Sequence, residues 1–117
     1  MLLRGQYTQG HDPLAHVRDK LFLAIVDITE STELQLQKRL RDAYTAHLDP
    51  LNPTDFPDDL RVAFESIGDR MTNLSAIWDR GHISTPSAVL PESNAKWLIA
   101  DIVSLFGNVC EALGRRG

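Results

Sequence analysis

The side chains that most readily suggest chemistry in this 117-residue chain are its histidines, because neutral imidazole is the commonest protein ligand for metals. The four histidines are His11, His16, His47 and His82. Only the first two are close in sequence, with Asp12 between them. A closed zinc site needs four ligands in short, paired spacings, and the chain has a single cysteine, Cys110. We therefore predict no metal site and no cofactor.

A second candidate pairs a cation with an imidazole, Arg41 and His47, in the segment Arg-Asp-Ala-Tyr-Thr-Ala-His. This segment resembles the Arg-x4-6-His signature of HEPN ribonucleases, which are small dimeric helical bundles. The resemblance implies that Arg41 and His47 are catalytic, meeting at a dimer interface and acting on RNA. The signature normally lies late in the fold, whereas here two long predicted helices follow it. On a straight helix the two residues would point about 120° apart, which favours ordinary surface residues.

A third candidate concerns two carboxylates, Asp27 and Asp69. Residues 23–32, Leu-Ala-Ile-Val-Asp-Ile-Thr-Glu-Ser-Thr, resemble the first metal-binding strand and turn of class III nucleotidyl cyclases, and Ile67-Gly68-Asp69 resembles the second. The resemblance implies a strand at 21–28, with Asp27 and Asp69 binding Mg²⁺ beside substrate phosphates. Glu30 stands where the turn of that family has glycine. The alternative interpretation places both carboxylates on the solvated flanks of helices.

Composition restricts the function classes. The formal net charge is -4, and the only dense basic group is Lys38, Arg39 and Arg41, so nucleic-acid binding is not expected. A single cysteine fits a reducing compartment. No apolar stretch follows the first residues as in a signal peptide, and the apolar run at 21–28 is far short of the ~20 residues that cross a bilayer. We expect a cytoplasmic protein that does not contact a membrane.

Apolar residues recur at helical spacing throughout the chain. Asp12-Pro13 predicts a helix start, since an N-cap acceptor precedes a proline at the first helical position. The pattern predicts helical segments at 13–30, 33–48, 57–80 and 93–113, with a kink or short break near 29–32 and a proline-containing loop at 82–93. We predict an all-α antiparallel bundle of about four helical segments. Residues 1–11 would form a flexible N-terminal arm and 12–117 a single helical domain.

The predicted core consists of one apolar stripe on each segment, and Trp78 and Trp97 are interpreted as core aromatics beside these stripes. The stripe residues are Leu14, Val17, Leu21, Ile25 and Ile28; Leu36, Leu40, Ala43, Tyr44 and Leu48; Leu60, Phe64, Ile67, Met71 and Leu74; Leu98, Ile102, Leu105, Phe106, Val109 and Leu113.

Three further apolar residues of the first segment, Phe22, Leu23 and Val26, point away from its stripe. An uncovered apolar patch commonly marks an interface, so we predict a homodimer through these residues, or else binding to another protein. Because the information in the chain lies in apolar faces, we expect a non-enzymatic interaction or accessory protein that self-associates. The HEPN-type ribonuclease using Arg41 and His47 is the first alternative, and the cyclase-like metal protein is the second.

Overall fold

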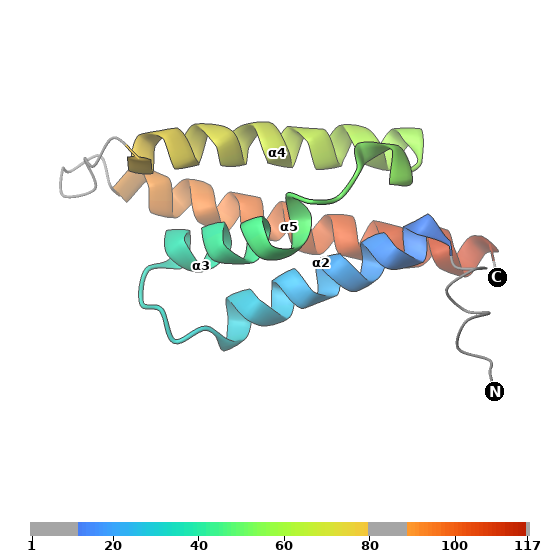
Figure 1. Ribbon diagram of the computed structural model, residues 1–117, viewed down its shortest axis with the longest axis horizontal. Helices are drawn as coiled ribbons and strands as arrows, with labels where there is room; N and C mark the ends of the chain where they lie inside the picture. The colour runs from blue at the N-terminus through green and yellow to red at the C-terminus, as the bar shows by residue number, and fades with distance from the viewer. Residues whose placement is uncertain (1–11, 80–88, 117) are drawn as a thin grey trace.

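The computed structural model describes residues 12–79 and 89–116, and over those ranges every regular element is helical. The elements are α2 (Pro13–Glu30), α3 (Leu36–Ala43), a π-helix (Tyr44–Leu48), a 3-10 helix (Pro53–Asp55), α4 (Asp58–Asp79) and α5 (Val89–Arg116). Each long segment runs opposite to the one before it, and α5 lies between α4 on one side and α2 and α3 on the other (Figure 1). The predicted all-α antiparallel bundle is confirmed.

Helix α2 begins and ends where the sequence predicts. The Asp12 carboxylate accepts a hydrogen bond of 2.9 Å from the Leu14 amide, and Pro13 occupies the first turn. The helix contains residues 21–28, so the strand implied by the cyclase resemblance is wrong. Its apolar residues repeat at spacings of three and four, and burying that stripe against other helices stabilises the helical conformation.

The predicted kink near 29–32 is a complete break. Ser31 is extended, with ψ of 142°, and its hydroxyl accepts a hydrogen bond of 3.0 Å from the Glu33 amide. Such local side-chain bonds compete with helical ones. Helix α3 consequently begins at Leu36 and not at residue 33.

The second segment ends in a π-helix, which the sequence analysis did not anticipate. The Asp49 amide donates to the Tyr44 carbonyl at 2.8 Å, a bond spanning five residues instead of the usual four. The wider turn changes the directions of the side chains that follow Ala43. Pro50 and Pro53 then prevent the helix from continuing.

Helix α5 begins earlier than predicted. Residues 89–93 belong to it, so the predicted loop at 82–93 is wrong over that part. Pro91 is tolerated because amides in the first turn have no helical acceptor. Helix α4 agrees with the predicted 57–80 over the described range. The predicted N-terminal arm, 1–11, lies outside the described residues and stays a prediction.

The core consists of the predicted stripes, with α5 in the middle, and no polar or charged side chain of the described residues is buried. Along α5 the buried positions are Ala95, Leu98, Ile102, Leu105 and Val109. Ile25, Leu36, Tyr44, Phe106 and Leu113 are only partly buried at its margin. The core assignment of Trp97 is wrong, because its side chain is 70% exposed. The side chains of Leu74 and Trp78 lie outside the described part.

Candidate functional site

The structure joins two residues that the sequence analysis assigned to rival chemistries. Nε2 of His47, on the π-helix, lies 2.6 Å from Oδ2 of Asp27, on α2. The imidazole is largely buried, and the carboxylate is half exposed. This hydrogen bond links the π-helix to α2. His47 therefore has a structural role that needs no reaction.

The HEPN-type alternative receives no support from this arrangement. Its imidazole would have to remain available for RNA beside Arg41, but it is hydrogen-bonded to Asp27. Arg41 lies on α3, before the π-turn that reorients His47, so the two residues belong to different helical segments.

The two carboxylates of the cyclase resemblance have different surroundings. Asp27 pairs with His47, while Asp69 lines a pocket beside Tyr44. Across the described residues, no group of three His, Cys, Asp or Glu side chains is placed to hold one metal ion. With 21–28 helical as well, the cyclase-like site is not formed.

The pocket beside Asp69 is the first candidate binding site. It has a volume of about 470 Å³ and lies between the π-helix, the 3-10 segment and α4. We call it the acidic pocket. Its lining residues are Tyr44, Asp49, Leu51, Pro53, Phe64, Glu65, Gly68 and Asp69.

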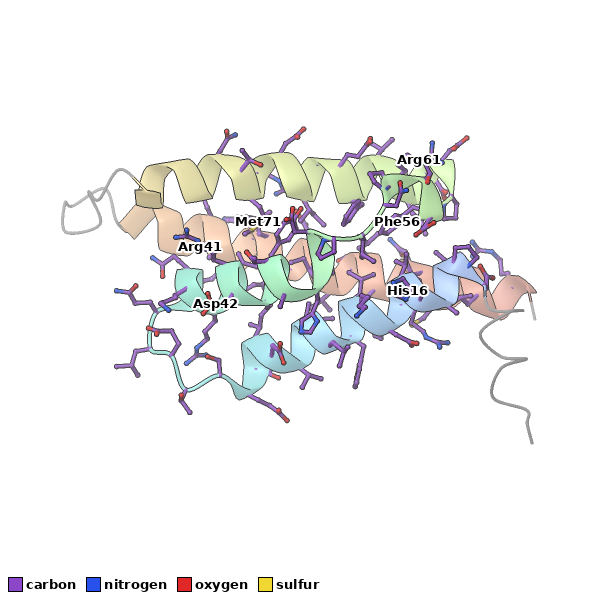
Figure 2. All side chains as sticks on the ribbon, viewed as in Figure 1. His16, Arg41, Asp42, Phe56, Arg61 and Met71 are labelled. Carbon is purple, nitrogen blue, oxygen red and sulfur yellow. The ribbon has the colours of Figure 1, made fainter. Side chains whose placement is uncertain are left out.

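Local packing explains how these residues meet. The Arg61 guanidinium donates to the carbonyls of Pro53 and Phe56, both at 3.1 Å, which ties the 3-10 segment to α4 (Figure 2). The Phe56 ring stacks on Phe64 with centroids 4.4 Å apart. These contacts hold one wall of the acidic pocket.

Tyr44 and Gly68 approach each other closely at the same place. A Cβ atom at position 68 would lie 3.1 Å from the Tyr44 hydroxyl oxygen, tighter than ordinary contact. Glycine therefore lets the phenol lie directly against α4. The sequence contained the residues of this site, but the contact depends on the π-turn, which no local pattern revealed.

The electrostatic field in the acidic pocket is negative. Burial raises the pKa of the Tyr44 phenol above its ordinary value of 10.0, and the charges of Asp49 and Asp69 raise it further. Asp49, Glu65 and Asp69 are exposed, and no described cation forms an ion pair with any of them. The pocket thus combines unpaired carboxylates with a neutral hydroxyl and an apolar wall.

The second candidate site is an apolar surface formed by α2 and α5. The rings of Phe22 and Phe106 have centroids 6.2 Å apart, and the exposed fractions of Phe22 and Val103 are 51% and 47%. Ile99, Val103, Phe106 and Cys110 follow one another at spacings of four, three and four, so they share one side of α5. Together with Phe22 and Val26, four residues apart on α2, we call these residues the α2–α5 face.

The α2 part of this surface was predicted from the sequence, and the α5 part was not. Phe22 and Leu23 are exposed as predicted, whereas Val26 is partly buried. Viewed down the helix axis, the three side chains lie within an arc of about 100°, with Phe22 at one edge and Leu23 at the other. The signal on α5 was present as a second apolar stripe beside the core stripe. Cys110, the single cysteine, is partly buried at the margin of this surface.

Helix α5 is more apolar than its burial requires. Residues Ser93–Arg115 have a window with mean hydropathy 1.4, enough by length and composition to cross a membrane, yet only 22% of that window is buried within the protein. The helix nonetheless packs against α2, α3 and α4, and its Asp101 pairs with Arg70 of α4 at 2.5 Å. It is a bundle helix with surplus apolar surface.

No family model, curated protein or solved structure matches the chain.

Proposed function

We propose that this protein is a helical interaction module that self-associates, with the α2–α5 face of one copy packed on the same face of another. The observation that carries the proposal is the surplus apolar surface of α5. Only 22% of the apolar window in this helix is buried within one chain. A helix that is apolar on most sides is normally covered on most sides.

Burial of this surface supplies the driving force. Phe22 and Val103 are each about half exposed, and covering a large apolar side chain completely is worth roughly 1.5–3 kcal/mol. In a two-fold dimer every such contact occurs twice, because each copy contributes the same patch. Covering half of each side chain on both copies therefore contributes several kcal/mol before the cost of association.

The surroundings of the face favour a second copy over a lipid surface. Arg18 and Asp19 pair at 3.0 Å on α2, and Glu111 and Arg115 pair at 3.2 Å on α5. These charges of both signs give no net positive rim to attract anionic lipid, and they do not repel an identical chain. Inserting α5 in a bilayer would also separate it from the three helices that it holds together.

Sedimentation velocity of the wild type, Phe22→Glu and Val103→Glu tests the proposal. We expect a dimeric wild type and two folded monomers, because each glutamate would bury a charge in the interface. Val62→Glu is the matched control, since Val62 is 67% exposed on α4, and this variant should remain dimeric.

A wild type that is monomeric at all concentrations up to hundreds of micromolar would contradict the proposal. So would dissociation of the Val62→Glu control to the same extent as the face variants. Circular dichroism shows whether each variant is folded, and Val103→Ser provides a milder substitution if a glutamate variant unfolds.

A further inference from the structure

We propose that α2 of each copy packs on α5 of the other copy, with the two-fold axis of the dimer parallel to these helices. This inference rests on the self-association proposed above, and it names the partner surface that each helix meets. Its basis is a match between residues of α2 and residues of α5, both in their order along the bundle and in their charge.

The height of each residue along the bundle is set within one chain. Helices α2 and α5 run in opposite directions (Figure 1), and the rings of Phe22 and Phe106 lie 6.2 Å apart. Because a helix rises about 1.5 Å per residue, positions after Phe22 lie level with positions equally far before Phe106. Rotation about an axis parallel to the helices does not shift these heights. A single chain therefore determines which residues of α2 lie level with which residues of the partner's α5.

The matching residues follow one side of each helix. Six of the eight are exposed, and the other two, Arg18 and Val26, are partly buried. Spacings of four and seven keep residues near one side of a helix. On α2 the residues are Arg18, Phe22, Val26 and Glu30, and on α5 they are Lys96, Val103, Gly107 and Glu111.

Opposite charges meet at both ends of this match. Arg18 lies within about one residue's rise of the partner's Glu111, and Glu30 within about two residues' rise of the partner's Lys96. Glu30 and Lys96 form no ion pair within the described part of one chain. Complementary charges fix the register of an interface and disfavour wrong arrangements. The charges therefore favour α5 of a second copy as the partner of α2.

Apolar residues meet between the two charge contacts. Phe22 lies about level with the partner's Gly107, and Val26 about level with the partner's Val103. A Cβ atom at Gly107 would meet nothing within 4 Å, so no packing contact within the described chain requires glycine there. Glycine inside a helix is destabilising relative to alanine. In the dimer, the missing side chain lets the ring of Phe22 lie directly against the partner's helix.

The other two-fold arrangement brings like charges together. An axis perpendicular to the helices, through the middle of Phe22 and Val26, would pack α2 on the partner's α2 in the opposite direction. Asp19 would then lie about level with the partner's Glu30, and these two positions are only about 20° apart around α2. Juxtaposed carboxylates oppose association. This arrangement is therefore disfavoured.

Charge reversal distinguishes the two arrangements. Glu30→Lys should raise the dissociation constant of the dimer about tenfold, because it places two cations together at both symmetry-related contacts. The double variant Glu30→Lys/Lys96→Glu should restore the wild-type value. Glu65→Lys is the matched control, since it makes the same substitution at an exposed position of α4, and it should leave the dissociation constant unchanged. Sedimentation equilibrium provides the measurement.

An unchanged or lower dissociation constant for Glu30→Lys would overturn the proposal, and a lower one is expected if α2 packs on the partner's α2. So would a double variant that dimerises no more tightly than the single variant. Circular dichroism shows whether each variant is folded.

Cross-linking provides a second measurement, in a Cys110→Ser background that removes the single natural cysteine. Val26→Cys and Val103→Cys proteins are treated with a short bismaleimide, separately and as a mixture. We expect covalent dimers in the mixture and none with either protein alone, because the two positions meet across the interface. Covalent dimers of Val103→Cys alone would place α5 on the partner's α5 and overturn the proposal.

These results are distinguishable from a failure of self-association. A wild type that stays monomeric would overturn the dimer and this arrangement together. A dimeric wild type with the opposite charge and cross-linking results would overturn the arrangement alone.

Discussion

Nε2 of His47 lies 2.6 Å from Oδ2 of Asp27, and this contact joins the π-helix to the neighbouring helix α2. Taken separately, each residue belonged to a plausible catalytic pattern in the sequence. In the folded protein each is the other's hydrogen-bond partner. The pair therefore shows how a contact between distant segments can explain residues that look functional.

We expect this contact to stabilise the fold measurably. A double-mutant cycle of His47→Ala and Asp27→Ala, followed by urea unfolding, should give a coupling free energy of about 0.5–1 kcal/mol, since Asp27 is half exposed. The exposed pair Lys38–Asp42 on α3, at 3.6 Å, provides the comparison and should couple by only about 0.3–0.5 kcal/mol. Equal coupling free energies in the two cycles would show that the His47–Asp27 contact stabilises the fold no more than an ordinary exposed ion pair.

The raised pKa of Tyr44 predicts a loss of stability at high pH. Its cause is burial first, then the charges of Asp49 and Asp69. Because the folded-state pKa lies above the unfolded value near 10.0, the stabilising contribution is complete below pH 10 and is lost as pH rises through the folded pKa. Asp49→Asn and Asp69→Asn should each move the phenol titration downward.

The measurement is ultraviolet absorbance of the phenolate in a Tyr7→Phe background, which leaves Tyr44 as the single tyrosine. Urea unfolding between pH 9 and 11 gives the matching stability curve, with Tyr44→Phe as the control that should lack this component. A Tyr44 titration at or below pH 10 would contradict the negative field of the acidic pocket.

The N-cap residue of α2, Asp12, should stabilise the fold through its side-chain oxygen. Asp12→Ala removes the acceptor of the Leu14 amide and should lower the free energy of unfolding by about 1 kcal/mol. Asp12→Asn keeps an oxygen acceptor and should retain most of that stability. Thermal unfolding of both variants is the measurement, and an equal loss in the two would point to charge instead of capping.

Identical substitutions at two valines should separate core from surface. Val17 is fully buried on α2, so Val17→Ala should cost about 2 kcal/mol through lost burial and the cavity that remains. Val62 is 67% exposed on α4, and alanine has the higher helix propensity there. Val62→Ala should therefore be neutral or slightly stabilising in urea unfolding, and a comparable loss at both sites would contradict the assigned core.

Local patterns in the sequence were sufficient for the fold class. The Asp12-Pro13 start, the stripe through Leu14, Val17 and Leu21, and the proline-marked end of the second segment all depend on interactions between residues close in the chain. The stripes of α4 and α5 also identified most of the core, because the buried side of an amphipathic helix can be recognised from its period.

Only the tertiary structure decided which residues form the candidate sites. The π-turn brings Tyr44 to Gly68 and His47 to Asp27. Each contact joins residues on helices that are not consecutive in the chain. Trp97 is exposed for a similar reason, since whether a helix flank is covered depends on where neighbouring helices lie. Periodicity determines which side of a helix is apolar, but it contains no information about what packs against that side.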